Sequence, residues 1–158
     1  MRLVLQVVCL SLVVSLGLAF PGSGRPYPSI LPHVDLVISA NTNNYNVFTS
    51  AGSPASAITV TLTINAGVLV GSTSTAVAAL DTGALPVGSS ITIINNGTVE
   101  GAGGNGGGGG GQTNTGLSAG GSGGPALVLH CPATITNNGN IWGGGGGGGG
   151  GGGCGVGP

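Results

Sequence analysis

Few side chains in this chain could take part in chemistry. Its charged residues are Arg2, Arg25, Asp35, Asp81 and Glu100, and its histidines are His33 and His130. The chain has no lysine, and no two carboxylates are placed to work together as acid and base. Because contact with several phosphates needs several cationic groups, nucleic acid is excluded as a partner. The composition also argues against hydrolytic and transfer catalysis.

Two catalytic motifs occur, but neither has the context that its chemistry needs. Residues 101–106 (Gly-Ala-Gly-Gly-Asn-Gly) match the dinucleotide-binding fingerprint, yet no helix is expected after them and no acidic residue follows Glu100. Residues 116–120 (Gly-Leu-Ser-Ala-Gly) match the nucleophile elbow, but no carboxylate follows to orient His130. A chain with 37 glycines is expected to contain such matches by chance. We therefore predict no enzyme and no cofactor.

The cysteines could form a metal site or a disulfide. His130 and Cys131 are adjacent and Cys154 could be a third ligand, but a structural zinc site normally has four ligands at regular spacing. We predict no metal. If a secreted chain loses its first 19 residues, Cys131 and Cys154 are the cysteines that remain. A disulfide between them would stabilise the chain by roughly 3 kcal/mol, and two unpaired thiols are the alternative.

Hydrogen-bonding groups rather than charges mark the candidate ligand site. Gln112, Thr113, Asn114 and Thr115 lie between glycine tracts. Their amides and hydroxyls could bind a carbohydrate or simply form a solvated connection. Trp142 stands where the longest glycine tract begins, and it could stack on a sugar ring or cap a small core. These five residues are the ligand-binding candidates.

The elements that would position these groups are β-strands. Over residues 56–65 the apolar side chains of Ile58, Val60, Leu62 and Ile64 alternate with threonines, which is typical of a half-buried strand. No apolar residues recur at helical spacing beyond the first 20 residues. We predict an all-β fold, with a β-rich repeat region over residues 34–100.

A repeat connects these strands to the glycine tracts. Residues 91–100 (Ile-Thr-Ile-Ile-Asn-Asn-Gly-Thr-Val-Glu) and 133–142 (Ala-Thr-Ile-Thr-Asn-Asn-Gly-Asn-Ile-Trp) are two copies of it, and a fainter copy begins at Thr63. Asn-Gly tolerates positive φ, so each copy predicts a tight corner between short strands. Corners at similar heights favour a short-stranded β-solenoid, in which neighbouring coils cover each other. A β-sandwich is the alternative.

Each copy of the repeat leads into glycine. The tracts cover residues 101–111, 120–124 and 143–153, and the last is eleven unbroken glycines. Ordering each glycine costs roughly 1–2 kcal/mol of backbone entropy, so a lone tract is normally a flexible linker. Polyproline-II-like helices of glycine could offset this cost by packing backbone against backbone with lateral hydrogen bonds. We predict such polyglycine-II-like tracts over residues 101–158, with an inserted strand at 126–142 and a module cut short at its end.

The N-terminal region predicts a targeting signal. Residues 1–19 have a positive start, an apolar stretch and small residues before a cleavage point after Ala19, as in a signal peptide. An uncleaved anchor over residues 1–20 is the alternative and would be the only contact with a membrane. The proline-rich residues 20–33 predict an extended linker, and His33 and Asp35 are expected to be solvated there.

The segments 60–74, 79–83 and 91–104 resemble glycine-rich tail proteins of tailed bacteriophages, in which Asn-Asn-Gly-x-Ile-x-Gly repeats lead into long glycine tracts. The resemblance covers about residues 35–155. It extends to the adhesin at the tip of T-even long tail fibres, whose polyglycine helices pack as a lattice and hold loops that touch the host. By this resemblance the loop 112–118 is a candidate specificity segment.

The resemblance implies a noncatalytic receptor-binding protein of the virion tail. Its partners would be a bacterial surface protein or glycan, together with other tail proteins or further copies of the same chain. The alternative is a secreted glycine-rich structural protein of a cell wall or extracellular matrix.

Overall fold

The computed structural model describes residues 30–110 and 118–152. The predicted signal peptide, residues 20–29 of the predicted linker, the candidate residues 112–115 and Cys154 lie outside the described residues. Within the described ranges, no helix has the length and apolar character needed to cross a bilayer.

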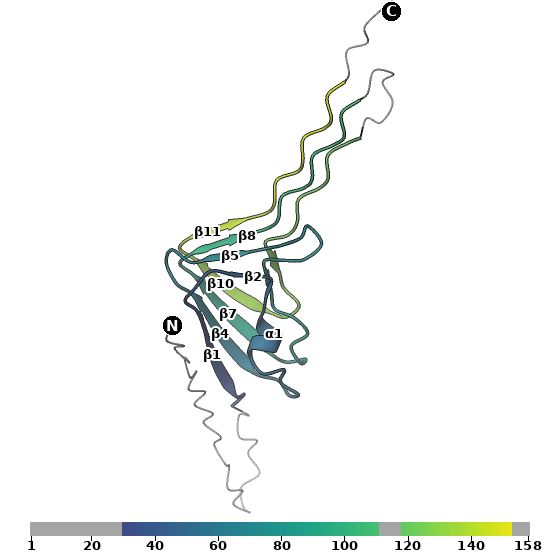
Figure 1. The fold of residues 1–158 in the computed structure, drawn as a ribbon. Coiled ribbons are helices and arrows are strands. Elements are labelled where there is room, and N and C mark those ends of the chain that lie inside the picture. The colour runs from purple at the N-terminus through teal and green to yellow at the C-terminus, as the bar shows by residue number, and fades with distance from the viewer. Residues whose placement is uncertain (1–29, 111–117, 153–158) are drawn as a thin grey trace, which may run out of the picture.

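Parallel strands wind into a coil with three sides (Figure 1). One sheet contains β1 (His33–Ile38), β4 (Thr59–Ile64), β7 (Ser90–Asn95) and β10 (Ala133–Asn137). A second contains β2 (Thr42–Asn43), β5 (Leu69–Gly71), β8 (Thr98–Glu100) and β11 (Asn140–Trp142), and a third contains β3 (Tyr45–Asn46), β6 (Leu80–Asp81) and β9 (Leu127–Val128). Every strand pair is parallel. The all-β prediction is confirmed, and the architecture is the solenoid rather than the sandwich.

The two clear copies of the repeat lie directly over each other. β7 and β10 pair from Ile91 opposite Ala133 to Asn95 opposite Asn137. β8 and β11 continue the same register, with Glu100 opposite Trp142. The alignment expected from the sequence is therefore the register of the last two coils.

The core is a column of side chains from the inward faces of the sheets. On β4 and β7 the inward-facing residues are almost inaccessible, and they include Leu62, Ile64 and Ile93. The threonines between them lie on the outer face, where they are partly exposed. Complete burial of one such apolar side chain contributes about 1.5–3 kcal/mol, so this column stabilises the solenoid despite the low content of aromatic residues.

The Asn-Asn-Gly corners do not use positive φ, which corrects the expectation from the sequence. Among the described glycines, those with positive φ are Gly52, Gly67, Gly83 and Gly88. At the corners, a Cβ added to Gly97 would lie 2.4 Å from the Val68 carbonyl oxygen, and one added to Gly139 would lie 1.9 Å from the Gly97 carbonyl oxygen. Glycine is required there because adjacent coils approach too closely for a side chain.

Three short elements escape the sequence patterns. Two of them are β2 and β3, which meet at Asn44 with φ of 52°. The single helical turn α1 (Val47–Ser50) follows, and its first turn is capped by the Asn46 side chain, which accepts a hydrogen bond from the Thr49 backbone N–H at 3.0 Å. Four residues are too few to show a helical period. His33 and Asp35 belong to β1 rather than to a linker.

The glycine segments are excursions from the solenoid. After β8 the chain leaves the third coil as residues 101–110, returns as 118–124, and re-enters the third sheet as β9 beside β6 (Figure 1). β10 and β11 then form the last coil, and the chain leaves again as residues 143–152. Residues 126–142 are thus solenoid strands rather than a strand inserted into a glycine region.

Candidate functional site

Three glycine-rich segments extend from the solenoid side by side and form one arm (Figure 1). We call residues 101–110 the first tract, 118–124 the second tract and 143–152 the third tract. The first and third tracts start from the neighbouring strands β8 and β11, so their direction is inherited from the parallel sheet. The second tract runs back toward the solenoid, antiparallel to both.

Backbone hydrogen bonds join the three tracts at every third residue. The first tract donates from Gly101, Gly104, Gly107 and Gly110 to the carbonyls of Trp142, Gly145, Gly148 and Gly151, at 2.7–2.9 Å. The second tract donates from Ser118, Gly121 and Gly124 to the first-tract carbonyls of Gly108, Asn105 and Ala102, respectively. The third tract donates from Gly144, Gly147 and Gly150 to the second-tract carbonyls of Gly124, Gly121 and Ser118, respectively. A three-residue repeat is that of a polyproline-II-type helix. Each tract therefore donates to one neighbour and accepts from the other.

The bonding requires glycine at the positions that face another tract. A Cβ on Gly144, Gly147 or Gly150 would lie 1.7–1.8 Å from a carbonyl oxygen of the first tract. In the second tract, a Cβ on Gly120 or Gly123 would lie 1.8–1.9 Å from a carbonyl oxygen of the third tract. Because no side chain fits in these gaps, the arm is held together mainly by backbone bonds, and the Ser118 hydroxyl adds one side-chain bond by accepting from the Gly108 N–H at 2.6 Å.

Trp142 and the outer end of the described arm lie far apart. At its outer end the first tract reaches Gly110, whose N–H bonds to Gly151, and the second tract begins at Ser118, which bonds to Gly108. The candidates 112–115 connect these two described ends in sequence. Trp142 lies at the base of the arm, where its carbonyl accepts from Gly101. At about 3.1 Å per residue, the nine residues to Gly151 span about 28 Å, so Trp142 cannot share one small site with the outer end.

Trp142 is an exposed aromatic residue. Its accessible fraction is 54%, and it is not among the residues packed against the buried core. On β11 it lies on the outward face beside Glu100 of β8. Its ring is therefore free to contact a partner at the base of the arm.

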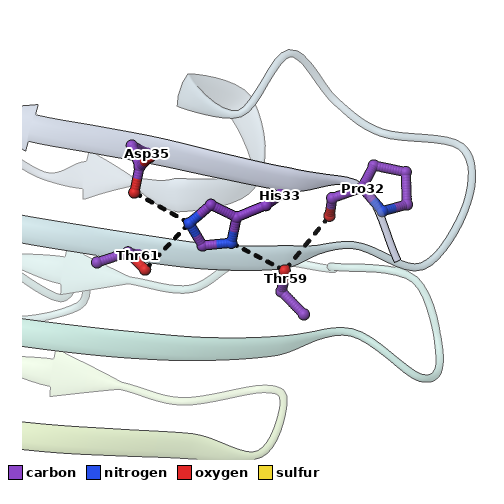
Figure 2. Close-up of polar contacts among 5 residues, drawn as sticks. All are labelled: Pro32, His33, Asp35, Thr59 and Thr61. Carbon is purple, nitrogen blue, oxygen red and sulfur yellow. Dashed lines mark hydrogen bonds and ion pairs between the residues drawn. The ribbon is translucent and has the colours of Figure 1, made fainter. Parts of the chain in front are cut away.

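A polar cluster occupies the outer face of the first coil (Figure 2). The His33 imidazole lies 3.0 Å from Asp35 through Nε2 and 2.9 Å from the Thr59 hydroxyl through Nδ1. The order carboxylate, imidazole, hydroxyl resembles a catalytic triad, but a triad aspartate is buried and an oxyanion hole accompanies it. Here the His33 and Asp35 side chains are 48% and 73% exposed on a strand face. The cluster gives the edge strand β1 a charged and polar surface. Such residues are common on edge strands, where they discourage pairing with another chain.

A second pair of a histidine and an aspartate lies at the third sheet. His130 Nε2 is 3.1 Å from an Asp81 carboxylate oxygen, and the His130 backbone N–H donates to the Thr82 hydroxyl at 2.8 Å. Burial raises the pKa of the neighbouring Cys131 thiol, and its hydrogen bond with Thr82 lowers the pKa by less. A thiol of raised pKa is a poor nucleophile and a poor metal ligand at neutral pH. Among the described residues, no three His, Cys, Asp or Glu side chains form a group that could hold a metal ion.

The sequence did not show that the glycine positions of the arm differ in role. The exposure of the first and third tracts varies with a period of three residues, and the partly covered positions include Gly104, Gly107 and Gly110 in the first tract and Gly144, Gly147 and Gly150 in the third. An unbroken run such as 143–152 carries no mark of this period. In the first tract, Ala102 and Asn105 interrupt the glycine at positions whose N–H groups make no bond to another tract, which was the available signal.

Comparison with protein families shows which family the chain belongs to. The model of the phage tail fibre adhesin Gp38 family matches residues 33–158, which include every strand and the whole arm. The chain belongs to the phage tail fibre adhesin Gp38 family. No curated protein and no solved structure matches it.

Family membership confirms the predicted resemblance to phage tail adhesins. The chain is a structural and adhesive protein of the phage tail that serves in receptor binding, and the alternative of a wall or matrix protein is not favoured. An adhesin family also fits the prediction that the protein is not an enzyme. Its partners are host surface receptors and other tail proteins, and its place is the virion tail.

Proposed function

We propose that the arm is a spacer that carries residues 112–115 to the bacterial surface, where they bind the receptor. The observation that supports this most directly is the set of bonds between the three tracts, which holds the described ends Gly110 and Ser118 together at the outer end. Because all three tracts bond to each other, the segment between these two ends is anchored on both sides. An anchored segment loses less conformational entropy on binding than a free one.

The chemistry of residues 112–115 fits a neutral, polar ligand. Gln112 and Asn114 offer amide donors and acceptors, and Thr113 and Thr115 offer hydroxyls. Such groups suit a glycan or the polar surface of an outer-membrane protein. Because the segment has no charge, its binding should change little with salt concentration.

The first coil is suited to contact the rest of the tail. The arm starts from β8 and β11 in the last two coils, whereas β1, β2 and β3 lie at the other end of the sheet order. The outer edge of β1 pairs with no strand among the described residues. Attachment there would leave the arm free to reach the host.

Binding of the labelled chain to intact bacteria tests this proposal. We expect the double substitution Gln112→Ala with Asn114→Ala to abolish binding to a susceptible strain. The matched control, Thr134→Ala with Thr136→Ala, removes exposed polar groups from the outer face of β10 and should leave binding unchanged. Protease treatment of the cells should abolish binding if the receptor is a protein. Periodate oxidation of the cells should abolish binding if the receptor is a glycan. If the double substitution leaves binding intact, the receptor site lies elsewhere.

A further inference from the structure

Asparagine is followed by glycine at three places in the chain, Asn96-Gly97, Asn105-Gly106 and Asn138-Gly139. Asparagine is a chemically labile residue, because the backbone nitrogen of the next residue can attack its side-chain amide carbon. Glycine in the next position favours this attack, since it has no Cβ and the greatest backbone freedom. The surroundings of each pair therefore decide which asparagine reacts in the folded protein.

The solenoid protects the pair between β7 and β8. Gly97 is buried, and its N–H, the group that would attack, donates to the Asn95 side chain at 3.1 Å. The Asn96 side-chain oxygen accepts from the Asn138 amide at 2.9 Å. Both reacting groups are thus held in other hydrogen bonds.

The pair between β10 and β11 is held by the coil beneath it. The N–H groups of Asn138 and Asn140, on either side of Gly139, donate to the Asn95 and Gly97 carbonyls at 2.8 and 2.9 Å. A Cβ on Gly139 would lie 1.9 Å from the Gly97 carbonyl oxygen, so this backbone packs closely on the preceding coil. These contacts restrict the rotation that would bring the Gly139 nitrogen onto the Asn138 amide.

The pair in the first tract lacks both kinds of protection. Asn105 and Gly106 are exposed, and among the described residues neither the Asn105 side chain nor the Gly106 N–H makes a hydrogen bond. The bonds to the third tract come from the N–H groups of Gly104 and Gly107, on either side of the pair. The attacking nitrogen and the side-chain amide are therefore free to meet.

We propose that Asn105 is the site at which the folded chain deamidates. The Gly106 nitrogen forms a bond to Cγ of Asn105, and ammonia leaves with the former Gly106 amide proton, which closes a succinimide ring. Water then opens the ring. Cleavage of the new bond to Cγ gives aspartate, and cleavage of the original peptide bond gives isoaspartate. Either product is the first charged side group in the sequence after Glu100.

The isoaspartate product changes the bonding of the arm. Its main chain runs through Cβ and Cγ and gains one atom, and the Asn105 backbone carbonyl becomes a free carboxylate. In the unmodified arm this carbonyl accepts from the Gly121 N–H at 2.7 Å. The bond from the Gly107 N–H to the third tract lies beyond the site and depends on the three-residue period, which the extra atom shifts. The bond from the Gly101 N–H to β11 precedes the site and is not affected.

Incubation of the native full chain at mildly alkaline pH, followed by peptide mass spectrometry, tests this assignment. We expect Asn105 to deamidate about tenfold or more faster than Asn96 and Asn138, whose reacting groups the solenoid restrains. In urea, where this restraint is lost, the three rates should converge. If Asn96 or Asn138 reacts as fast as Asn105 in the native chain, the proposal is overturned.

Two alanine variants of the first tract provide a matched pair. Gly106→Ala adds a Cβ that hinders the attack but has room in the arm, since it would lie 4.0 Å from the Gly148 carbonyl oxygen. It should slow the reaction at Asn105 by about tenfold or more. The control Gly103→Ala places a Cβ 3.8 Å from the Gly145 carbonyl oxygen and should leave the rate unchanged. A rate that Gly106→Ala does not lower contradicts the proposed attack.

Hydrogen exchange tests the effect on the arm. In the isoaspartate form, isolated by ion exchange, the N–H groups of Gly107 and Gly121 should exchange faster while that of Gly101 stays unchanged. The variant Asn105→Asp carries the same charge on an ordinary main chain and should exchange like the wild type. Equal exchange in the isoaspartate form and in this variant would refute the change in the period of the arm.

Discussion

At the scale of single residues, Asn95 is the polar group on which the stacking of the last coil depends. It is fully buried, and its Nδ2 donates to the Asn137 side chain at 2.7 Å and to the Asn140 carbonyl at 3.0 Å. Its Oδ1 accepts from the Gly97 backbone N–H at 3.1 Å. Asn95 thus links the corner between β7 and β8 to the corner between β10 and β11.

We expect Asn95→Ala to lower the free energy of unfolding by about 2–3 kcal/mol, because three bonds are lost and the Gly97 N–H is left buried without a partner. Urea denaturation measures this loss. The control is Asn138→Ala, which removes an exposed side chain with a single bond to Asn96 at 2.9 Å and should cost less than about 1 kcal/mol. Equal losses would show that the buried asparagine has no special role.

Cys131 makes a second prediction at this scale. Because burial raises the pKa of its thiol, the unfolded chain ionises first as the pH rises. The folded state should therefore lose stability on the alkaline side of the ordinary thiol pKa. At mildly alkaline pH, alkylation of Cys131 by iodoacetamide, located by peptide mass spectrometry, should be slower in the native protein than in urea. Equal rates would mean that burial does not protect the thiol.

At the scale of elements, the arm depends on which glycines face a neighbour. A Cβ on Gly147 would lie 1.8 Å from the Asn105 carbonyl oxygen, whereas one on Gly148 would meet nothing within 4 Å. We expect Gly147→Ala to accelerate hydrogen exchange at the Gly107 and Gly121 N–H groups by about tenfold or more, since the tracts must separate locally. Gly148→Ala should leave both rates unchanged. If both variants exchange alike, the tracts are not packed as the bonding pattern requires.

At the scale of the whole molecule, the solenoid holds the core and the arm adds almost nothing to it. Among the buried core residues, Ala126 alone follows Glu100 in the sequence. We expect a chain that ends at Glu100 to unfold cooperatively in urea, as followed by circular dichroism. Its stability should be reduced because Ile91, Ile93 and Val99 lose the cover of the last coil. It should not bind bacteria, since it has no arm.

A chain that ends at Ser89 is the control for this truncation. It lacks Ile91, Ile93 and Val99 altogether and should not fold. If the chain that ends at Glu100 is also unfolded, the last coil is required for folding rather than supported by the coils before it.

The sequence by itself determined the character of the alternating strands and of the repeated segments. Alternation at Ile58, Val60, Leu62 and Ile64 predicts a strand with one buried face, because side-chain direction alternates along any extended backbone. The two copies at 91–100 and 133–142 also align with each other in the sequence, and the structure pairs them in the same alignment. Alternation is a local property of the backbone, and the repeat is a similarity between two segments. Both can be recognised without knowledge of the fold.

The tertiary structure alone decided where backbones approach each other. It showed that Gly97 and Gly139 are needed for the close spacing of the coils rather than for a positive φ. It also showed that Gly144, Gly147 and Gly150 face the first tract, whereas the glycines between them do not. It also showed that the strands within residues 126–142 belong to the solenoid. The physical reason is that a glycine has no side chain to record its surroundings. Its role is set by atoms far away in the sequence, and only the folded chain brings them together.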